Sequence, residues 1–154
     1  MIQRIQTLYL VIADILIALL LFLPVAAVSA KDGKLYHVTL QGLIPEGTGA
    51  GAAIQYAWPL LIFACLVMAW LVWVIFRYGN RVRQIQFSYV AIVLLLGLTA
   101  LVYYYVRADQ DSLGGISSLS IFFSFPLIAA VFVYLAIQGI AKDEKLIKSI
   151  DRIR

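Results

Sequence analysis

Four long runs of apolar residues divide the chain, and shorter polar segments separate them. The runs cover residues 5–28, 56–76, 87–106 and 119–140. Each has roughly 20 to 24 residues, and an α-helix of that length crosses the ~30 Å hydrocarbon core of a bilayer. None alternates between apolar and polar positions, and the strands of a membrane barrel would be only about half as long. The pattern therefore predicts four membrane-spanning helices.

The connections between these runs predict how the helices are arranged. Short connections favour an up-and-down four-helix bundle, in which neighbours in the sequence are also neighbours in space. The turn around Gly79–Gln84 is the shortest, so the second and third helices are the surest neighbours. Pro126 lies inside the fourth run and predicts a kink there. We expect residues 1–154 to form a single membrane domain.

The segment between the first two runs, about residues 30–55, is predicted to be the longest part outside the membrane. From Leu35 to Gln41 the residues alternate, with Tyr36, Val38 and Leu40 on one face. This period of two predicts a short strand or a hairpin. Glycines and a proline follow and favour turns.

Composition supports the membrane interpretation. Hydrophobic residues make up 64% of the chain and charged residues 13%, whereas soluble domains have about 45–50% and about 25%. A soluble fold would expose much of this excess to water. The net charge of +4 alone would permit a nucleic acid partner. Its uneven distribution instead indicates a lipid bilayer as the partner and no nucleic acid.

Basic residues predict the orientation. Nine lie at the N-terminus, in the second connection and in the C-terminal tail, and three lie in the other two connections. The positive-inside rule places the nine in the cytoplasm. Trp58 and Tyr103–Tyr105 fall where the outer aromatic belt is expected. We therefore expect both ends inside, with the chain crossing the bacterial inner (cytoplasmic) membrane several times.

The first run has a second interpretation. Residues 1–30 begin with a positive charge, continue as an apolar stretch and end in Val28-Ser29-Ala30, which is similar to a signal-peptidase site. The apolar stretch, however, exceeds the usual length and contains Asp14. We favour a retained first helix.

The tail, residues 142–154, predicts an amphipathic helix. Leu146, Ile147, Ile150 and Ile153 recur at helical spacing. Four basic side chains on the remaining faces make it a candidate docking tail: Lys145, Lys148, Arg152 and Arg154. Such a helix lies on an anionic inner leaflet or binds a partner protein.

Asp14 is the one ionisable residue well inside a predicted span. It lies about 13 Å beyond Ile5 along the helix, where a charge costs at least ~2.5 kcal/mol. Thr7, two turns earlier, shares its face, and Tyr134 and Tyr89 are its nearest polar candidates across the bundle. Together they form a candidate intramembrane polar site. We expect Asp14 to be protonated or hydrogen-bonded, in contact with a partner subunit, or part of a proton or ion path.

No catalytic, cofactor-binding or metal site is predicted. His37 is the only histidine and Cys65 the only cysteine, so neither a disulfide nor a zinc site can form within one chain. We expect Cys65 to be a small buried hydrophobic residue. We expect no cofactor, and no nucleophile–base pattern is visible.

Several local sequences are similar to those of a known family. They are the opening Met1-Ile2-Gln3-Arg4-Ile5-Gln6-Thr7, the charged ending that starts at Lys142-Asp143-Glu144, and the internal Trp58-Pro59-Leu60 and Asn80-Arg81. With the four-span layout, they resemble domain-of-unknown-function family 4293, small inner-membrane proteins of Bacteroidota. The resemblance implies the fold and the location, and it brings no settled activity.

These features favour a non-enzymatic accessory or structural subunit of a membrane complex, bound to another membrane protein or to further copies of itself. The alternative is a small oligomeric transporter, channel or proton-conducting element that uses Asp14. A membrane enzyme would need more polar intramembrane groups than the sequence offers.

Overall fold

The structure, a computed structural model, describes residues 3–31, 33–47, 55–77 and 81–151. Over these residues the chain forms long helices and one small antiparallel sheet. The helices are α1 (Gln3–Leu20), α2 (Trp58–Phe76), α3 (Arg81–Leu113) and α4 (Phe125–Asp151), and the strands are β1 (Ala26–Ser29), β2 (Leu35–Thr39), β3 (Gly42–Pro45), β4 (Gln55–Tyr56) and β5 (Ile116–Leu119). A short 3-10 helix, η1 (Ile121–Ser124), leads into α4.

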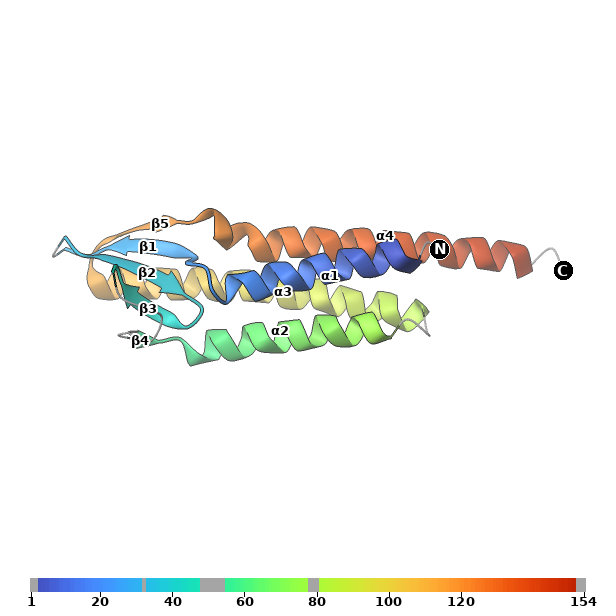
Figure 1. The fold of residues 1–154 in the computed structure, drawn as a ribbon, viewed down its shortest axis with the longest axis horizontal. Coiled ribbons are helices and arrows are strands. Elements are labelled where there is room, and N and C mark those ends of the chain that lie inside the picture. The colour runs from blue at the N-terminus through green and yellow to red at the C-terminus, as the bar shows by residue number, and fades with distance from the viewer. Residues whose placement is uncertain (1–2, 32, 48–54, 78–80, 152–154) are drawn as a thin grey trace.

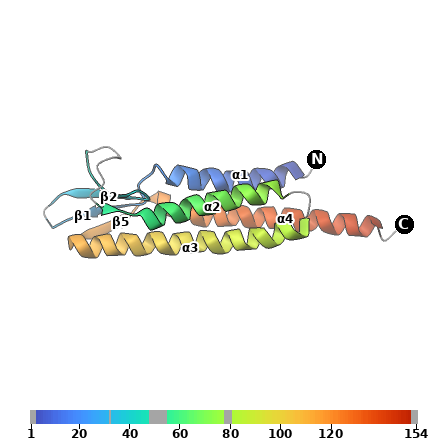
Figure 2. The same cartoon turned by 90° about the horizontal axis from the view of Figure 1, so that it is seen from below.

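The helices run side by side along the long axis, and the sheet lies at one end (Figure 1, Figure 2). Both α1 and α3 contact α2 and α4, so the four helices close a ring. α2 and α3, the predicted neighbours, are in contact, but the most extensive contact joins α1 to α4. The first and last helices are therefore packed against each other.

Each helix buries one stripe of apolar residues, spaced by three or four, toward the centre of this ring. The stripes include Leu10, Ala13 and Ile17 of α1, Leu60, Ala64 and Val67 of α2, Leu95, Leu98 and Val102 of α3, and Ala129, Val133 and Ile140 of α4. The outward faces are apolar too, as the exposed Ile62, Val93 and Val131 show. Helices that are apolar all round belong in lipid.

Within the described residues, three helical segments are long and apolar enough to cross a membrane: α2, α3 and Ile121–Asp143. The apolar part of α1, Ile5–Leu20, is shorter. The protein is thus mostly helical with three candidate spans and a small antiparallel sheet. A fourth crossing, by α1, and the orientation of the chain stay predictions.

The first apolar run was predicted as one helix over residues 5–28, and this extent is wrong. The helix ends at Leu20, and Ala26–Ser29 form strand β1. Pro24 separates the two because proline cannot continue a helix and disfavours helical geometry in the residue before it. A buried strand and a buried helix are equally apolar, so hydrophobicity alone does not distinguish them.

The sheet has the order β4-β3-β2-β1-β5, with antiparallel neighbours. The predicted hairpin is confirmed as β2 and β3, paired from Tyr36↔Pro45 to Thr39↔Gly42. Val38 and Leu40, which the alternation placed on one face, are buried, and so is Thr39 from the other face. β1 and β5 contact α3, so the sheet packs on the end of the longest helix.

The remaining helix boundaries differ from the predicted ones. α3 extends past 87–106 at both ends. Where the fourth run was expected to begin, at 119, β5 ends, and α4 starts only at Phe125. Pro126 therefore lies in the first helical turn and not at a kink inside the helix. Proline is tolerated there because the N–H group that it lacks would have no helical partner.

The prediction that Cys65 is buried is also wrong. It is exposed on α2, because it lies on the outward face of a helix that is apolar on every side. In such a helix an apolar neighbourhood in the sequence does not indicate which face is buried.

Candidate functional site

Asp14 lies in α1 directly after the buried Ala13. Its Oδ1 atom is buried and has no hydrogen-bond partner among the described residues. A buried carboxylate oxygen without a partner is unusual and needs an explanation. Among the described residues, Asp14 thus carries a buried polar atom whose hydrogen-bonding capacity is not met within the chain.

Two other residues of the predicted intramembrane site lie on exposed faces of their helices. Tyr89 of α3 and Tyr134 of α4 are both exposed, so their side chains lie on outward faces of the ring. Thr7 lies two turns before Asp14 on the same helix. The structure thus shows a buried Oδ1 atom at Asp14, with Tyr89 and Tyr134 exposed on their own helices.

A second polar contact joins the two ends of the chain. The Nε2 amide of Gln6 donates a hydrogen bond to Oδ2 of Asp143, and both side chains are buried. Next to it, a Cβ atom built on Gly139 would lie 3.0 Å from Cγ of Gln6. The glycine therefore lets α4 approach α1 closely at this point.

This contact was missed in the sequence, although a signal for it exists. Gln6 precedes Leu10, Ala13 and Ile17 at spacings of four, three and four, which is the buried stripe of α1. A polar residue on that stripe needs a buried partner. The partner lies 137 positions away, so no local pattern identifies it.

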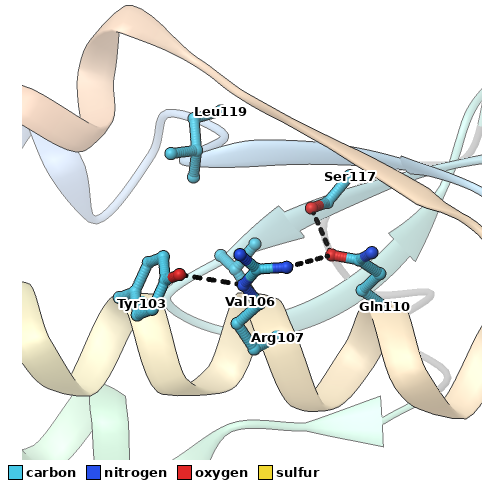
Figure 3. Close-up of a pocket in the computed structure, with 6 residues that line it drawn as sticks. All are labelled: Tyr103, Val106, Arg107, Gln110, Ser117 and Leu119. Carbon is cyan, nitrogen blue, oxygen red and sulfur yellow. Dashed lines mark hydrogen bonds between the residues drawn. The ribbon is translucent and has the colours of Figure 1, made fainter.

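The third site is a pocket of about 200 Å³ between the C-terminal end of α3 and strand β5. Figure 3 shows Tyr103, Arg107 and Gln110 along α3, with Ser117 and Leu119 across from them. The side chains from α3 meet because residues three, four and seven apart share one helix face. The sequence did not reveal this pocket. Arg107 was considered there only as one of the basic residues that predict the orientation of the chain.

Hydrogen bonds fix the polar side of this pocket. Nε of Arg107 donates to the Tyr103 hydroxyl at 2.9 Å, and Nη1 donates to Oε1 of Gln110 at 3.4 Å. The Ser117 hydroxyl donates to the same Oε1 at 2.6 Å. The guanidinium also lies 5.3 Å from the centre of the Tyr103 ring. One arginine is thus held by a tyrosine and a glutamine.

The candidate docking tail is described only in part. Lys145 and Lys148 belong to α4, whose helical backbone continues to Asp151. Arg152 and Arg154 lie outside the described residues. In the part of the chain that the structure describes, no group of three or more His, Cys, Asp or Glu residues could hold a metal ion.

Long helices with apolar outward faces, joined to a small sheet at one end, define a membrane protein. The comparison with protein families specifies which group it is. The chain belongs to the family "Domain of unknown function (DUF4293)", whose profile matches residues 2–153, nearly the whole chain. The resemblance noted in the sequence is thereby confirmed. No match to the chain was found among curated proteins.

Proposed function

We propose that this protein is a non-enzymatic accessory or structural subunit of a complex in the bacterial inner membrane, and that a partner protein docks on strand β5. The observation that carries the proposal is the open edge of the sheet. β5 is the last strand in the order β4-β3-β2-β1-β5, and among the described residues it pairs with β1 alone.

This edge lacks the features that protect most edge strands. Natural sheets cover their edges or place charges and prolines there. The sequence of β5 is Ile-Ser-Ser-Leu, with neither. Ile116 is 79% exposed, and Ile121 just after the strand is 77% exposed. An exposed apolar edge favours partners that add a strand of their own.

The position of Ile116 supports a protein partner over lipid at this point. Ile116 pairs with Ser29 at the far end of β1, whereas Leu119 at the other end of β5 precedes η1 and α4 in the chain. Ile116 also follows Leu113, which lies about 15 Å beyond Tyr103 on the helical rise. This side chain thus lies beyond the expected aromatic belt, where water or protein surrounds it.

Photocrosslinking in native membranes tests the proposal. A photoreactive amino acid at Ile116 should give one discrete heavier product with a protein partner. The matched control is Val93, which is also exposed but lies in the middle of α3 and should react mainly with lipid. Ser118→Lys should abolish the product, because a charge on the edge strand opposes strand addition.

The size of the product identifies the partner. A product of twice the chain's mass would mean that the partner is a second copy. Absence of any protein product at both Ile116 and Ser118 would contradict docking at this edge.

A second candidate, a small oligomeric transporter, channel or proton-conducting element, is favoured by Asp14. Its buried Oδ1 has no partner among the described residues, and such groups inside membranes often belong to ion or proton paths. The test is proton flux into vesicles that contain the purified protein. Flux should fall at least tenfold in Asp14→Asn, and unchanged flux would exclude the carboxylate as the conducting group.

A further inference from the structure

We infer that the pocket between α3 and β5 binds the phosphodiester headgroup of a phospholipid in the leaflet next to the sheet. The inference is independent of the docking proposal, because it concerns the inner face of β5 and not its open edge. It rests on the hydrogen-bond inventory of the pocket, on its charge and on its position along α3.

Several hydrogen-bond donors of the pocket are not used by the bonds within it. The acceptor Oε1 of Gln110 already receives two hydrogen bonds, from Arg107 and Ser117. The Tyr103 oxygen receives one from Arg107, so its own proton can be donated elsewhere. Arg107 uses two of its five N–H groups in these bonds, and both N–H groups of the Gln110 amide remain. A ligand here meets mostly N–H and O–H groups, which an anion accepts.

The orientation of the Gln110 amide follows from chemistry. Arginine can only donate hydrogen bonds, so the Gln110 atom that faces Arg107 must be the oxygen. The amide nitrogen then points away from the guanidinium, as Figure 3 shows. Gln110 thus holds Arg107 in place with its oxygen and keeps its nitrogen for a ligand.

The charge of the pocket selects a phosphate. The six described residues that line it include one guanidinium and no carboxylate. The planar fork of arginine matches two oxygens of a phosphate group. A volume of about 200 Å³ has room for a phosphate and part of the glycerol to which it is attached.

The position of the pocket selects a lipid as the source of that phosphate. Tyr103 and Tyr104 are exposed where the aromatic belt is expected, and Arg107 lies one turn, about 5–6 Å, further toward the sheet. That is the level of the headgroups. Val106 and Leu119 form the apolar part of the lining, and the exposed Ile121 follows on the membrane side. A lipid can thus place its phosphate at Arg107 and its glycerol against apolar side chains.

The test is the binding of phosphatidylglycerol to the full-length protein, purified in an uncharged detergent and followed by native mass spectrometry. We expect one saturable lipid per chain. Arg107→Gln should weaken its affinity about tenfold or more, because hydrogen bonds to charged groups are the strong ones. The matched control is Arg83→Gln, which removes an exposed arginine near the opposite end of the same helix and should leave the affinity unchanged.

Gln110→Glu is the second variant, chosen because it keeps the pocket folded. The glutamate still accepts the bonds from Arg107 and Ser117, but it replaces the amide donors with a negative charge. We expect a loss of affinity as large as that of Arg107→Gln. If both variants bind the lipid as the unmodified protein does, the inference is wrong.

Two further ligands separate the possible sources of the phosphate. Diacylglycerol, which has no phosphate, should not displace the lipid. Glycerol 3-phosphate, which has no acyl chains, should displace it only at concentrations at least a hundredfold higher, since it lacks the apolar part. Displacement at equal concentrations would show a site for soluble phosphate esters and overturn the assignment to a lipid.

Discussion

At the scale of single residues, the sequence shows which polar groups are unusual but not what they contact. Asp14 stands out because charged residues are rare inside apolar runs, and its Oδ1 is buried without a hydrogen-bond partner among the described residues. Gln6 and Asp143 do not stand out in this way, because each lies at the polar end of its helix. Their hydrogen bond depends on how α1 and α4 pack, which is a property of the whole fold. For the same reason the pocket at Arg107 was not predicted.

The buried bond between Gln6 and Asp143 leads to a prediction about stability. Asp143→Ala should lower the free energy of unfolding by about 1–3 kcal/mol, because the Gln6 amide would be left buried without an acceptor. Denaturant titration in mixed micelles measures this change. The matched control is Lys142→Ala, because Lys142 is exposed, and we expect it to change the free energy by less than about 0.5 kcal/mol.

The double variant Gln6→Leu with Asp143→Leu tests the reason for this effect. Replacing both partners with apolar groups can be nearly neutral, so the double variant should be less destabilised than the sum of its two single variants. Additive effects would mean that the two side chains do not interact.

At the scale of elements, hydrophobic periodicity predicted helices and one hairpin, and it failed at strands β1 and β5. β1 was assigned to a helix because Val25–Val28 are all apolar, and the same holds for the end of β5 at Leu119. β5 is recognised only through its pairing with β1, Ala26↔Leu119 to Ser29↔Ile116. That pairing connects residues about 90 positions apart. No window along the sequence contains it.

Gly115 permits this pairing, and its substitution is the prediction for the sheet. A Cβ atom at residue 115 would lie 1.8 Å from the backbone oxygen of Ser29, which is far inside contact distance and cannot be relieved by a side-chain rotation. Gly115→Ala should therefore separate β5 from β1 and lower the free energy of unfolding by about 1–3 kcal/mol or more. Hydrogen exchange of the β1 amides should become faster.

The same substitution at Gly97 is the control. A Cβ there would lie 3.6 Å from the Phe63 ring, an ordinary contact, and alanine is the better helix former by up to about 1 kcal/mol. Gly97→Ala should therefore leave the protein equally stable or slightly more stable. Equal effects of the two variants would mean that the contact with Ser29 does not matter.

At the scale of the whole molecule, the membrane class was predictable because it depends on sums over many residues. Composition and run length need no knowledge of contacts. The pairing of α1 with α4 was not predictable, since only ring closure brings the first and last helices together. The closed ring of helices is also relevant to the number of membrane spans. α1 is short, but it lies along the longer α4 (Figure 1). If α4 crosses the bilayer, this packing favours a crossing by α1 as well.

The orientation is the last prediction, and cysteine labelling tests it. Cys65 is the only cysteine, so Cys65→Ala gives a background without thiols. Single cysteines at three exposed positions then mark the two ends of the molecule: Ser118 on the sheet, Gln86 near the start of α3, and Ile5 at the start of α1. None of these changes alters the basic residues that set the orientation.

We expect an impermeant maleimide, added outside the inner membrane, to label Ser118→Cys at once. Gln86→Cys should be labelled only after the membrane is opened, because the basic residues at that end favour the cytoplasm. Ile5→Cys should behave like Gln86→Cys if α1 crosses the bilayer beside α4. Labelling of Ile5→Cys from the same side as Ser118→Cys would instead show that the protein has three spans, and labelling of Gln86→Cys from outside would reverse the predicted orientation.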